Sequence, residues 1–493
     1  MMSDFLQALT YHHNHPLLFS SVLFFILFSA FYFIYVFAFN NIKVRNLMLL
    51  LFSLYFYYKV GGVAIFVLLA ISTTDFFIGK WIFNSKMKSA KGWLLSLALL
   101  LDLGSLIYFK YTNFFLQSWA GINGIQDPIV LNIILPIGIS YFIFKSLSYI
   151  FDVYREVIEI PEKNYFNYVL YVSFFPNILA GPISKAADLL PQIREKLIIN
   201  REMLSKGFFL IMSGAFKKIF IADFLAGNFV DRVFDAPDYF SGFESLVASY
   251  GYTIQLYFDF SGYTDIVIGI ACLLGFSLLP NFNKPFSATN VTDFWRRWHL
   301  TLSAWLRDYV FTKMSLKLRN WGTFGLMFSV FITFIICGFW HDAKVTFILW
   351  GALHGLAMAW DIFTTKIRNK LKKKVNKGIY KFFSIFITFH FICFAFVMFR
   401  AADVSTALKV YEKIFTGVDF SLAGQWISLY FYPFLVLLLG LILHYTPFSW
   451  NTRILGRFTK LHWALKSCVI VFAFVVIYQV FSAQAQAFIY LEF

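Results

Sequence analysis

Three histidines occur in the stretch of this sequence that carries the strongest chemical signal, residues 290–360. His299 and His341 each follow a tryptophan in otherwise apolar sequence, and His354 lies a little further along the chain. An ionisable side chain at membrane depth is costly, so it is by default a functional candidate. A neutral, buried imidazole can take a proton from a hydroxyl group when a partner fixes its tautomer. His341 is therefore our candidate general base; the alternative is a structural histidine that donates to a backbone carbonyl.

The spacing of the histidines argues against a metal site. On one unbroken helix, His354 would be rotated by about 220° away from His341, so the pair would not share a face. All four cysteines lie in apolar runs and lack the spacing of a metal or disulfide framework. We therefore predict no metal.

Residues 294–310 have the pattern of an amphipathic helix. Its apolar stripe repeats every three or four residues and consists of Trp295, Trp298, Leu302, Trp305 and Tyr309. Arg296 and Arg297 lie off this stripe, which is typical of an interfacial helix anchored by aromatic and basic side chains. The two arginines and His299 would also suit the border of an entrance for an anionic donor, such as the phosphates of coenzyme A. Both interpretations can hold together.

The composition indicates an integral membrane protein. The 493 residues are 59% hydrophobic and only 14% charged, whereas a soluble domain is about half apolar and about a quarter charged. The net charge of +16 is attributed to cytoplasmic loops and anionic lipid. No basic stretch is interleaved with aromatic residues on a soluble face, so we predict no nucleic-acid partner.

Apolar runs along the chain predict about 10 to 13 helical passes, some of them re-entrant. The segment 364–381 carries eight Lys and Arg and no acid, which places it at the cytoplasmic face. Counted from there, residues 341–344 form the turn of a hairpin that starts and ends on that side. We expect one polytopic domain, 1–493, with a core at about 20–400 and additional spans at about 427–483.

Two aspartates, Asp259 and Asp265, lie between apolar runs in the segment YFDFSGYTD. A buried carboxylate needs a cationic partner. We expect a structural role for both, through pairing with Lys145 or an arginine.

Taken together, several motifs resemble the signature of membrane-bound O-acyltransferases. The principal ones are TDFWRRWHLTLSAWLRDYVF (292–311) and GFWHDAKVTFILWGALHGL (338–356). Upstream segments continue the match, namely 135–155, 174–183, 214–226 and 252–276. The pattern looks closest to the bacterial branch that contains the membrane subunit of alginate O-acetylation and the related peptidoglycan O-acetyltransferase.

The resemblance implies an all-α ring of helices around a central conduit in the bacterial inner or plasma membrane. It also implies that His341 is catalytic and that His299 supports it. The donor, acetyl-CoA or a carrier-protein thioester, would enter from the cytoplasm and the exported polysaccharide from outside. The usual WHG motif reads WHD here, so Asp342 either raises the basicity of His341 or points into the turn. Residues expected to line the substrate or the conduit are Trp295, Arg296, Arg297, Trp298, Trp340, Asp342 and His354.

Within this resemblance, the acceptor would be alginate or a cell-wall glycan, and an SGNH-type acetyltransferase outside the membrane would be a partner. A D-alanyl transfer protein of teichoic acid synthesis, which takes its donor from a carrier protein, is the first alternative. A transporter or flippase without transferase activity is the second, because broken helices and intramembrane charges suit it too. The absence of an internal repeat speaks against transport.

Overall fold

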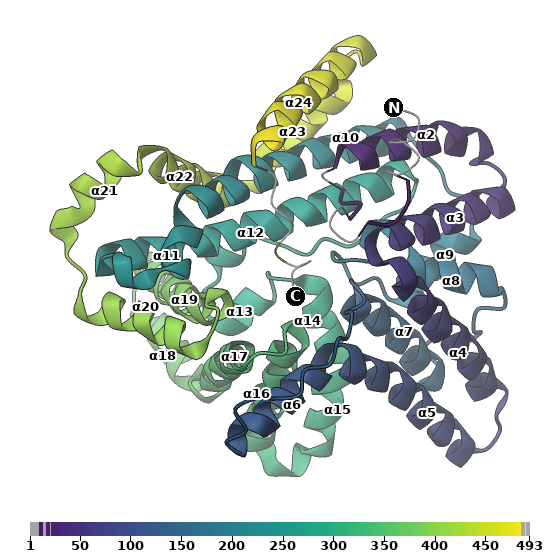
Figure 1. The fold of residues 1–493 in the computed structure, drawn as a ribbon, viewed down its shortest axis with the longest axis horizontal. Coiled ribbons are helices and arrows are strands. Elements are labelled where there is room, and N and C mark those ends of the chain that lie inside the picture. The colour runs from purple at the N-terminus through teal and green to yellow at the C-terminus, as the bar shows by residue number, and fades with distance from the viewer. Residues whose placement is uncertain (1–8, 13–15, 20, 485–488, 490–493) are drawn as a thin grey trace. The chain divides into compact units, whose positions relative to one another are not determined.

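The computed structural model describes residues 9–12, 16–19, 21–484 and 489. These residues form helices joined by turns and loops, and they contain no strand (Figure 1). Inside a bilayer, backbone N–H and C=O groups have no water to bond, so an apolar chain satisfies them within its own helices. The predicted all-α membrane fold is confirmed, and the protein is a multi-pass membrane protein.

Six helical segments of the described chain are long and apolar enough to cross a membrane. They are Ile42–Asn84, Lys88–Ile122, Gly242–Leu273, Arg319–His341, Val345–Phe363 and Lys377–Arg400. A seventh span results if Phe420–Leu429 and Phe431–Tyr445, which meet at an angle of 102°, count as one broken pass. Several of the other predicted passes are short or broken helices. One of these predicted passes, the apolar run at 164–183, contains a nine-residue helix followed by a short 3-10 turn and irregular chain, with two prolines.

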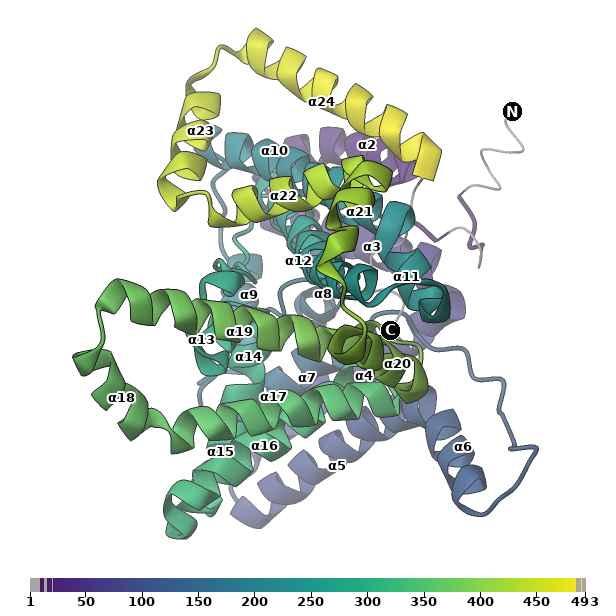
Figure 2. The same ribbon diagram turned by 90° about the vertical axis from the view of Figure 1, so that its left-hand side faces the viewer.

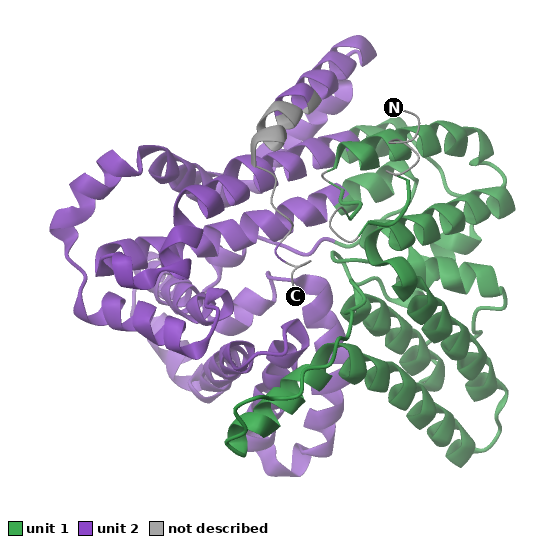
Figure 3. Cartoon of the chain, viewed as in Figure 1, with its two compact units in different colours: residues 1–207, 267–279 green, residues 208–266, 280–493 purple. Residues whose placement is uncertain are grey.

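The chain divides into two compact units (Figure 3). Unit 1 comprises residues 1–207 and 267–279, and unit 2 comprises residues 208–266 and 280–493. Two helices contribute to both units, α10 (Arg201–Phe216) and α12 (Gly242–Leu273). The expected single domain over 1–493 stays a prediction.

Unit 1 is an assembly of packed helices in which α4 (Ile65–Asn84) contacts α5 (Lys88–Leu106) and α7 (Ile139–Tyr154). Phenylalanine and tyrosine rings fill much of its interior, in keeping with the aromatic composition. Among its described residues, the other α-helices are α2 (Val22–Ala38), α3 (Ile42–Gly61), α6 (Thr112–Ile122), α8 (Tyr165–Ser173) and α9 (Ala186–Arg194).

Unit 2 contains all the candidate catalytic and conduit-lining residues that the sequence analysis named. Its elements near these residues are α13 (Val291–Trp295), α14 (Leu300–Leu306), α16 (Gly322–His341), α17 (Val345–Phe363) and α19 (Lys377–Arg400). Figure 2 shows α17 and α19 side by side, joined at one end by α18 (Thr365–Lys374). The other helices are α11 (Asp231–Asp235), α15 (Thr312–Lys317), α20 (Val404–Thr416), α21 (Ala423–Leu429), α22 (Phe431–Tyr445), α23 (Phe448–Lys460) and α24 (Trp463–Gln484).

The helices α16 and α17 of unit 2 form a closely packed hairpin. Its turn is short, because α16 ends at His341 and α17 begins at Val345, as the sequence predicts. Two facing glycines allow the backbones to touch. A Cβ on Gly338 would lie 2.2 Å from the Phe347 carbonyl oxygen, and one on Gly351 would lie 2.3 Å from that of Phe334. Small residues at such crossings let membrane helices pack backbone to backbone.

The two aspartates of α12 have ionic partners, but not the predicted ones. Asp259 pairs with Lys218 (Oδ1–Nζ 2.5 Å), and Asp265 pairs with Lys217 (Oδ2–Nζ 2.6 Å). Lys145 instead donates to the side chain of Asn177. The expected structural pairing is confirmed for both carboxylates, and the expected partners are wrong, because the lysines come from the π-helical segment Lys217–Asp223.

Candidate functional site

A break in the helix places His299. The sequence predicts one helix over 294–310, but α13 ends at Trp295 and α14 begins at Leu300, so that prediction is wrong. His299 lies in the break with a left-handed backbone (φ 43°), which side chains other than glycine seldom adopt. The five residues of the predicted apolar stripe are nevertheless all buried. The pattern identified which side chains face the interior and missed the change of direction between them.

A preceding loop holds this break in place through hydrogen bonds. Asn281 accepts the backbone N–H of Leu300 on its carbonyl (3.0 Å) and the Thr301 hydroxyl on its side chain (2.7 Å). Asn283 donates its N–H to the Arg297 carbonyl (2.9 Å). Strained backbone persists only where its surroundings over-determine it, and such residues concentrate at functional sites. The strain at His299 therefore supports its selection as a site residue.

The His299 ring is buried among aromatic rings. It lies edge-on to Phe260 of α12 (ring centroids 4.7 Å apart) and near Trp340 (6.4 Å). His299 lies outside the candidate membrane spans. Burial lowers the pKa of His299 to about 3, so the imidazole is neutral near pH 7.

His341 is the last residue of α16 and is surrounded by rings from three elements. Trp340 precedes it, Trp350 of α17 lies 5.2 Å away between ring centroids, and Phe399 of α19 lies 5.3 Å away. Its residue surface is 4% exposed. The short turn and the surrounding aromatic rings therefore shield the His341 imidazole from most water.

The carboxylate of Asp342 is engaged within the turn. One oxygen accepts the N–H of Ala343 (2.8 Å), and the other lies 3.0 Å from the ammonium of Lys344. Of the two orientations that the WHD motif allows, these contacts favour the carboxylate that points into the turn.

His354 is a buried residue of α17 and forms a hydrogen bond with a residue of α13. Trp295 donates its indole Nε1–H to Nδ1 of His354 (3.2 Å), and Trp350 lies 4.8 Å from the histidine ring. His354 is fully buried, and its Nε2 has no hydrogen-bond partner among the described residues. His341 and His354 therefore flank the same Trp350 from different helices, which the single-helix argument from the sequence did not anticipate.

The three histidines belong to one aromatic cluster. Trp340 contacts His299 and His341, Trp350 contacts His341 and His354, and Trp295 contacts Trp350 and His354. Trp298 packs beside this cluster against Phe294 and Phe396. The structure thus brings together the predicted residues Trp295, Trp298, His299, Trp340, His341 and His354.

The two arginines differ in their surroundings. Arg297 pairs with Asp293 (Nε–Oδ1 2.8 Å), which lies four residues earlier. Arg296 is exposed, with no ionic partner among the described residues. Arg296 is thus the more available of the two for an anionic ligand.

Sequence reasoning missed the contribution of α19. Phe391 and Phe396 contact His354, and Phe399 contacts His341. In the sequence, these residues lie in a largely apolar run, SIFITFHFICFAFVMF, in which no phenylalanine stands out from the others. Only their proximity to the histidines distinguishes them.

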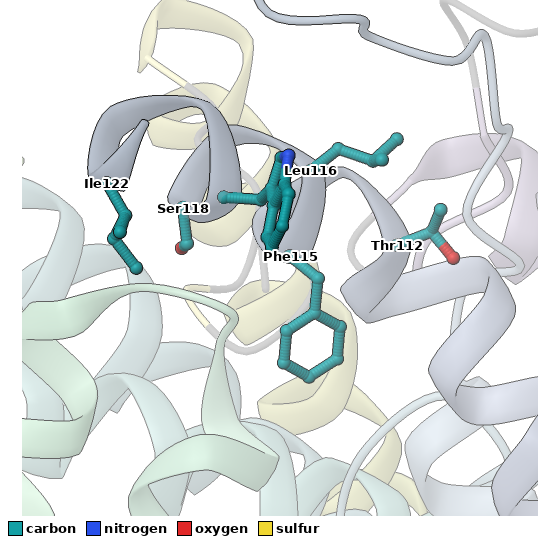
Figure 4. A pocket seen from close by; sticks show the side chains of 6 residues that line it. Thr112, Phe115, Leu116, Ser118 and Ile122 are labelled. Carbon is teal, nitrogen blue, oxygen red and sulfur yellow. The ribbon is translucent and has the colours of Figure 1, made fainter. Parts of the chain in front are cut away.

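Two other features of the described chain do not belong to this cluster. A hollow on the surface of α6 is lined by Thr112, Phe115, Leu116, Ser118, Trp119 and Ile122 (Figure 4). It contains no charged residue and none of the predicted site residues. No group of three or more histidine, cysteine, aspartate or glutamate side chains could hold a metal ion within the described residues.

Comparisons with known proteins show the family of this chain. The family model described as MBOAT, membrane-bound O-acyltransferase family, matches residues 52–401. A probable alginate O-acetylase of Pseudomonas putida is 35% identical over 415 residues, which cover 83% of this chain and 82% of that protein. The peptidoglycan O-acetyltransferase of Helicobacter pylori is 34% identical over 403 residues, covering 75% and 74%.

A more distant relative extends the range of acyl groups. The teichoic acid D-alanyltransferase of Bacillus subtilis is 31% identical over 276 residues, covering 54% of this chain and 69% of that protein. The family match at residues 52–401 contains the whole aromatic histidine cluster. This chain belongs to the membrane-bound O-acyltransferase family and is an O-acyltransferase.

Proposed function

We propose that the protein transfers an acetyl group from a cytoplasmic thioester to a hydroxyl group of an exported polysaccharide, with His341 as the general base. The observation that carries this proposal is the position of His341 at the turn of the α16–α17 hairpin, between Trp350 and Phe399. The names of the relatives, a probable alginate O-acetylase and a peptidoglycan O-acetyltransferase, supply the acetyl group and the glycan class.

The chemistry balances with one histidine. The acceptor hydroxyl oxygen attacks the thioester carbonyl carbon while His341 takes the hydroxyl proton. The tetrahedral intermediate then collapses, the carbon–sulfur bond breaks, and the thiolate leaves with the proton that His341 held. The products are an ester and a free thiol. A positioned general base contributes about 10²–10⁴-fold to such a step, and holding the reactants together supplies a further large share.

The other site residues have supporting roles in this proposal. The neutral His299, which lies beside Trp340, would keep the site uncharged and orient that ring. Arg296 and Arg297 would attract the anionic donor, acetyl-CoA or a carrier-protein thioester. Trp295, Trp298, Trp340 and His354 would form the wall of the conduit, with Asp342 in the adjoining turn.

The D-alanyltransferase relative supports a second candidate. In that case, the donor is a carrier-protein thioester and the acceptor is a teichoic acid. The smaller coverage, 54% of this chain, ranks this candidate below acetyl transfer. For acetylation of an exported glycan, we also propose an SGNH-type acetyltransferase outside the membrane as a partner. When that partner is present, it would accept the acetyl group from this protein and pass it to the glycan.

The test uses the full-length protein in membrane vesicles with radiolabelled acetyl-CoA and a polysaccharide acceptor. The wild type should release free thiol and label the glycan, or the SGNH partner when that partner is present. His341→Ala should reduce the rate by about 10²–10⁴-fold at an unchanged protein level. A D-alanyl thioester on a small carrier protein is the parallel arm that identifies the second candidate.

His390→Ala is the matched control. His390 lies on α19, and its Nδ1 contacts the Phe386 carbonyl within the same helix (2.8 Å), outside the aromatic histidine cluster. It should keep wild-type activity. Full activity in His341→Ala would refute the role of His341, and glycan export without any acyl transfer would refute the proposed reaction.

A further inference from the structure

Two basic helices of unit 2 lie at the same end of its long helices. Figure 2 shows α18, which joins α17 to α19, and α23, which joins α22 to α24, both at the left-hand end of that unit. The segment 364–381 is the one that the sequence places at the cytoplasmic face. Neither helix contains an acidic residue.

The lysines of and beside α18 have no protein counter-charge. Seven are exposed, and none forms an ion pair or hydrogen bond within the described residues. These are Lys366, Lys370, Lys372, Lys373, Lys374, Lys377 and Lys381. Arg368 is the exception, since it pairs with Asp361 at the end of α17 (NH1–Oδ1 3.1 Å). That pair fixes how α18 leaves α17 and leaves the lysines free for another partner.

The basic residues of α23 share one side of that helix. Arg453, Arg457 and Lys460 are spaced by four and three residues, and all three are exposed. In the described part of the chain, they too have no ionic partner. The helix is held to unit 2 by buried Phe458, whose ring lies 6.1 Å from that of Phe209 on α10.

Large apolar side chains are exposed on the same two helices. Ile367 and Leu371 of α18 are 63% and 48% exposed, and Trp450 and Ile454 of α23 are 56% and 52% exposed. Each pair is spaced by four residues, so it forms a short apolar ridge beside the basic side chains. A soluble polyanion would satisfy the charges and leave these ridges in water. A lipid surface satisfies both, because apolar side chains insert below the headgroups while cations remain among the phosphates.

We infer that α18 and α23 form a binding surface for anionic phospholipid, which anchors unit 2 to the headgroups of one leaflet. Each basic residue close to an anionic membrane strengthens binding by roughly fivefold, and the effect fades within a Debye length. The acyl group and the acceptor play no part in this inference.

The test measures which lipids the full-length protein retains. The protein is reconstituted in bilayers of equal parts phosphatidylcholine and phosphatidylglycerol, extracted, and examined by native mass spectrometry. The wild type should retain phosphatidylglycerol in preference to phosphatidylcholine, and raising the salt concentration should weaken this preference. A charge-removed variant should lose at least about tenfold of the preference. It carries K366Q, K370Q, K373Q, R453Q, R457Q and K460Q.

The matched control keeps every charge by exchanging lysine and arginine at the same six positions, and it should behave as the wild type. Because all six side chains are exposed, both variants should keep the melting temperature of the wild type. Unchanged phosphatidylglycerol retention in the charge-removed variant would overturn the inference. Displacement of the lipid by inorganic phosphate, beyond the effect of sodium chloride at equal ionic strength, would also overturn it, since the ligand would then be a free anion.

Discussion

The indole Nε1–H of Trp295 donates a hydrogen bond to Nδ1 of His354 at 3.2 Å. This contact joins α13 to the middle of the α16–α17 hairpin. An indole only donates, so Nδ1 must accept, and the neutral ring carries its proton on Nε2. The tautomer of His354 is thereby determined by a residue 59 positions earlier in the chain.

Trp295→Phe should destabilise the protein by about 1–3 kcal/mol, because a buried acceptor loses its donor. The melting temperature in detergent measures this loss. Trp350→Phe is the control for the smaller ring, since the Trp350 indole N–H has no hydrogen-bond partner among the described residues. Equal destabilisation by the two changes would show that the hydrogen bond contributes nothing beyond packing.

The free energy of unfolding should decrease as the pH is lowered below 6.5, because His299 is buried in its neutral form. Burial lowers the pKa of His299 to about 3, from the ordinary value of 6.5 that it regains on unfolding. Between pH 6.5 and pH 3, His299 is protonated in the unfolded chain but stays neutral in the folded protein. Stability should therefore drop by up to about 1.4 kcal/mol per pH unit as the pH falls toward 3.

His299→Gln should flatten this part of the stability curve, which melting temperatures between about pH 8 and about pH 4 can trace. The other buried histidines remain in that variant, so part of the slope will persist. A slope identical to that of the wild type would mean that His299 is already charged, or reaches water, in the folded protein.

Asp342→Asn should change kcat/KM by less than about threefold and leave the pH–rate profile in place. The Asp342 carboxylate is bound to Ala343 N–H and to Lys344, which is half exposed, and such pairs contribute little. A shift of the profile by about one pH unit or more would show instead that the carboxylate tunes His341. Kinetics over a pH series decide between the two orientations of the WHD motif.

Gly338→Ala should destabilise the hairpin and reduce activity, since the added Cβ would lie 2.2 Å from a backbone oxygen. Overpacking of this kind costs about 1–3 kcal/mol and would displace His341, three residues further on. Gly92→Ala on α5 is the control, because its Cβ would meet nothing within 4 Å. That change should be neutral or stabilising by up to about 1 kcal/mol. Similar losses in both would argue against close hairpin packing.

Asp361→Ala should loosen the start of α13. One oxygen of Asp361 accepts both the N–H (2.8 Å) and the hydroxyl (2.9 Å) of Thr292, and the other pairs with Arg368. Loss of this buried acceptor should cost about 1–3 kcal/mol and speed hydrogen exchange at residues 291–295. Asp308→Ala removes the exposed Arg307 pair and should cost at most about 1 kcal/mol. Unchanged exchange in Asp361→Ala would show that contacts other than those of Asp361 hold the start of α13.

The membrane class, the short hairpin turn and the list of candidate side chains all follow from the sequence. Hydropathy depends only on neighbouring residues, so it identifies a membrane span regardless of which helices that span contacts. The turn at 341–344 is local for the same reason. The sequence also predicted that the apolar stripe from Trp295 to Tyr309 is buried, because apolar residues spaced by three or four positions share one face of a helix.

Only the tertiary structure decided how those residues meet. The break at His299 is held by hydrogen bonds with Asn281 and Asn283, which lie outside the motif, and a left-handed backbone is uncommon for any residue other than glycine. The carboxylates of α12 pair with lysines on a π-helical segment. His341 contacts Phe399, which is one of many phenylalanines in an apolar run. Hydrogen bonds and ring contacts between distant segments depend on the path of the chain in space. A sequence pattern can therefore identify the histidines of this site, while packing decides which of them share a tryptophan.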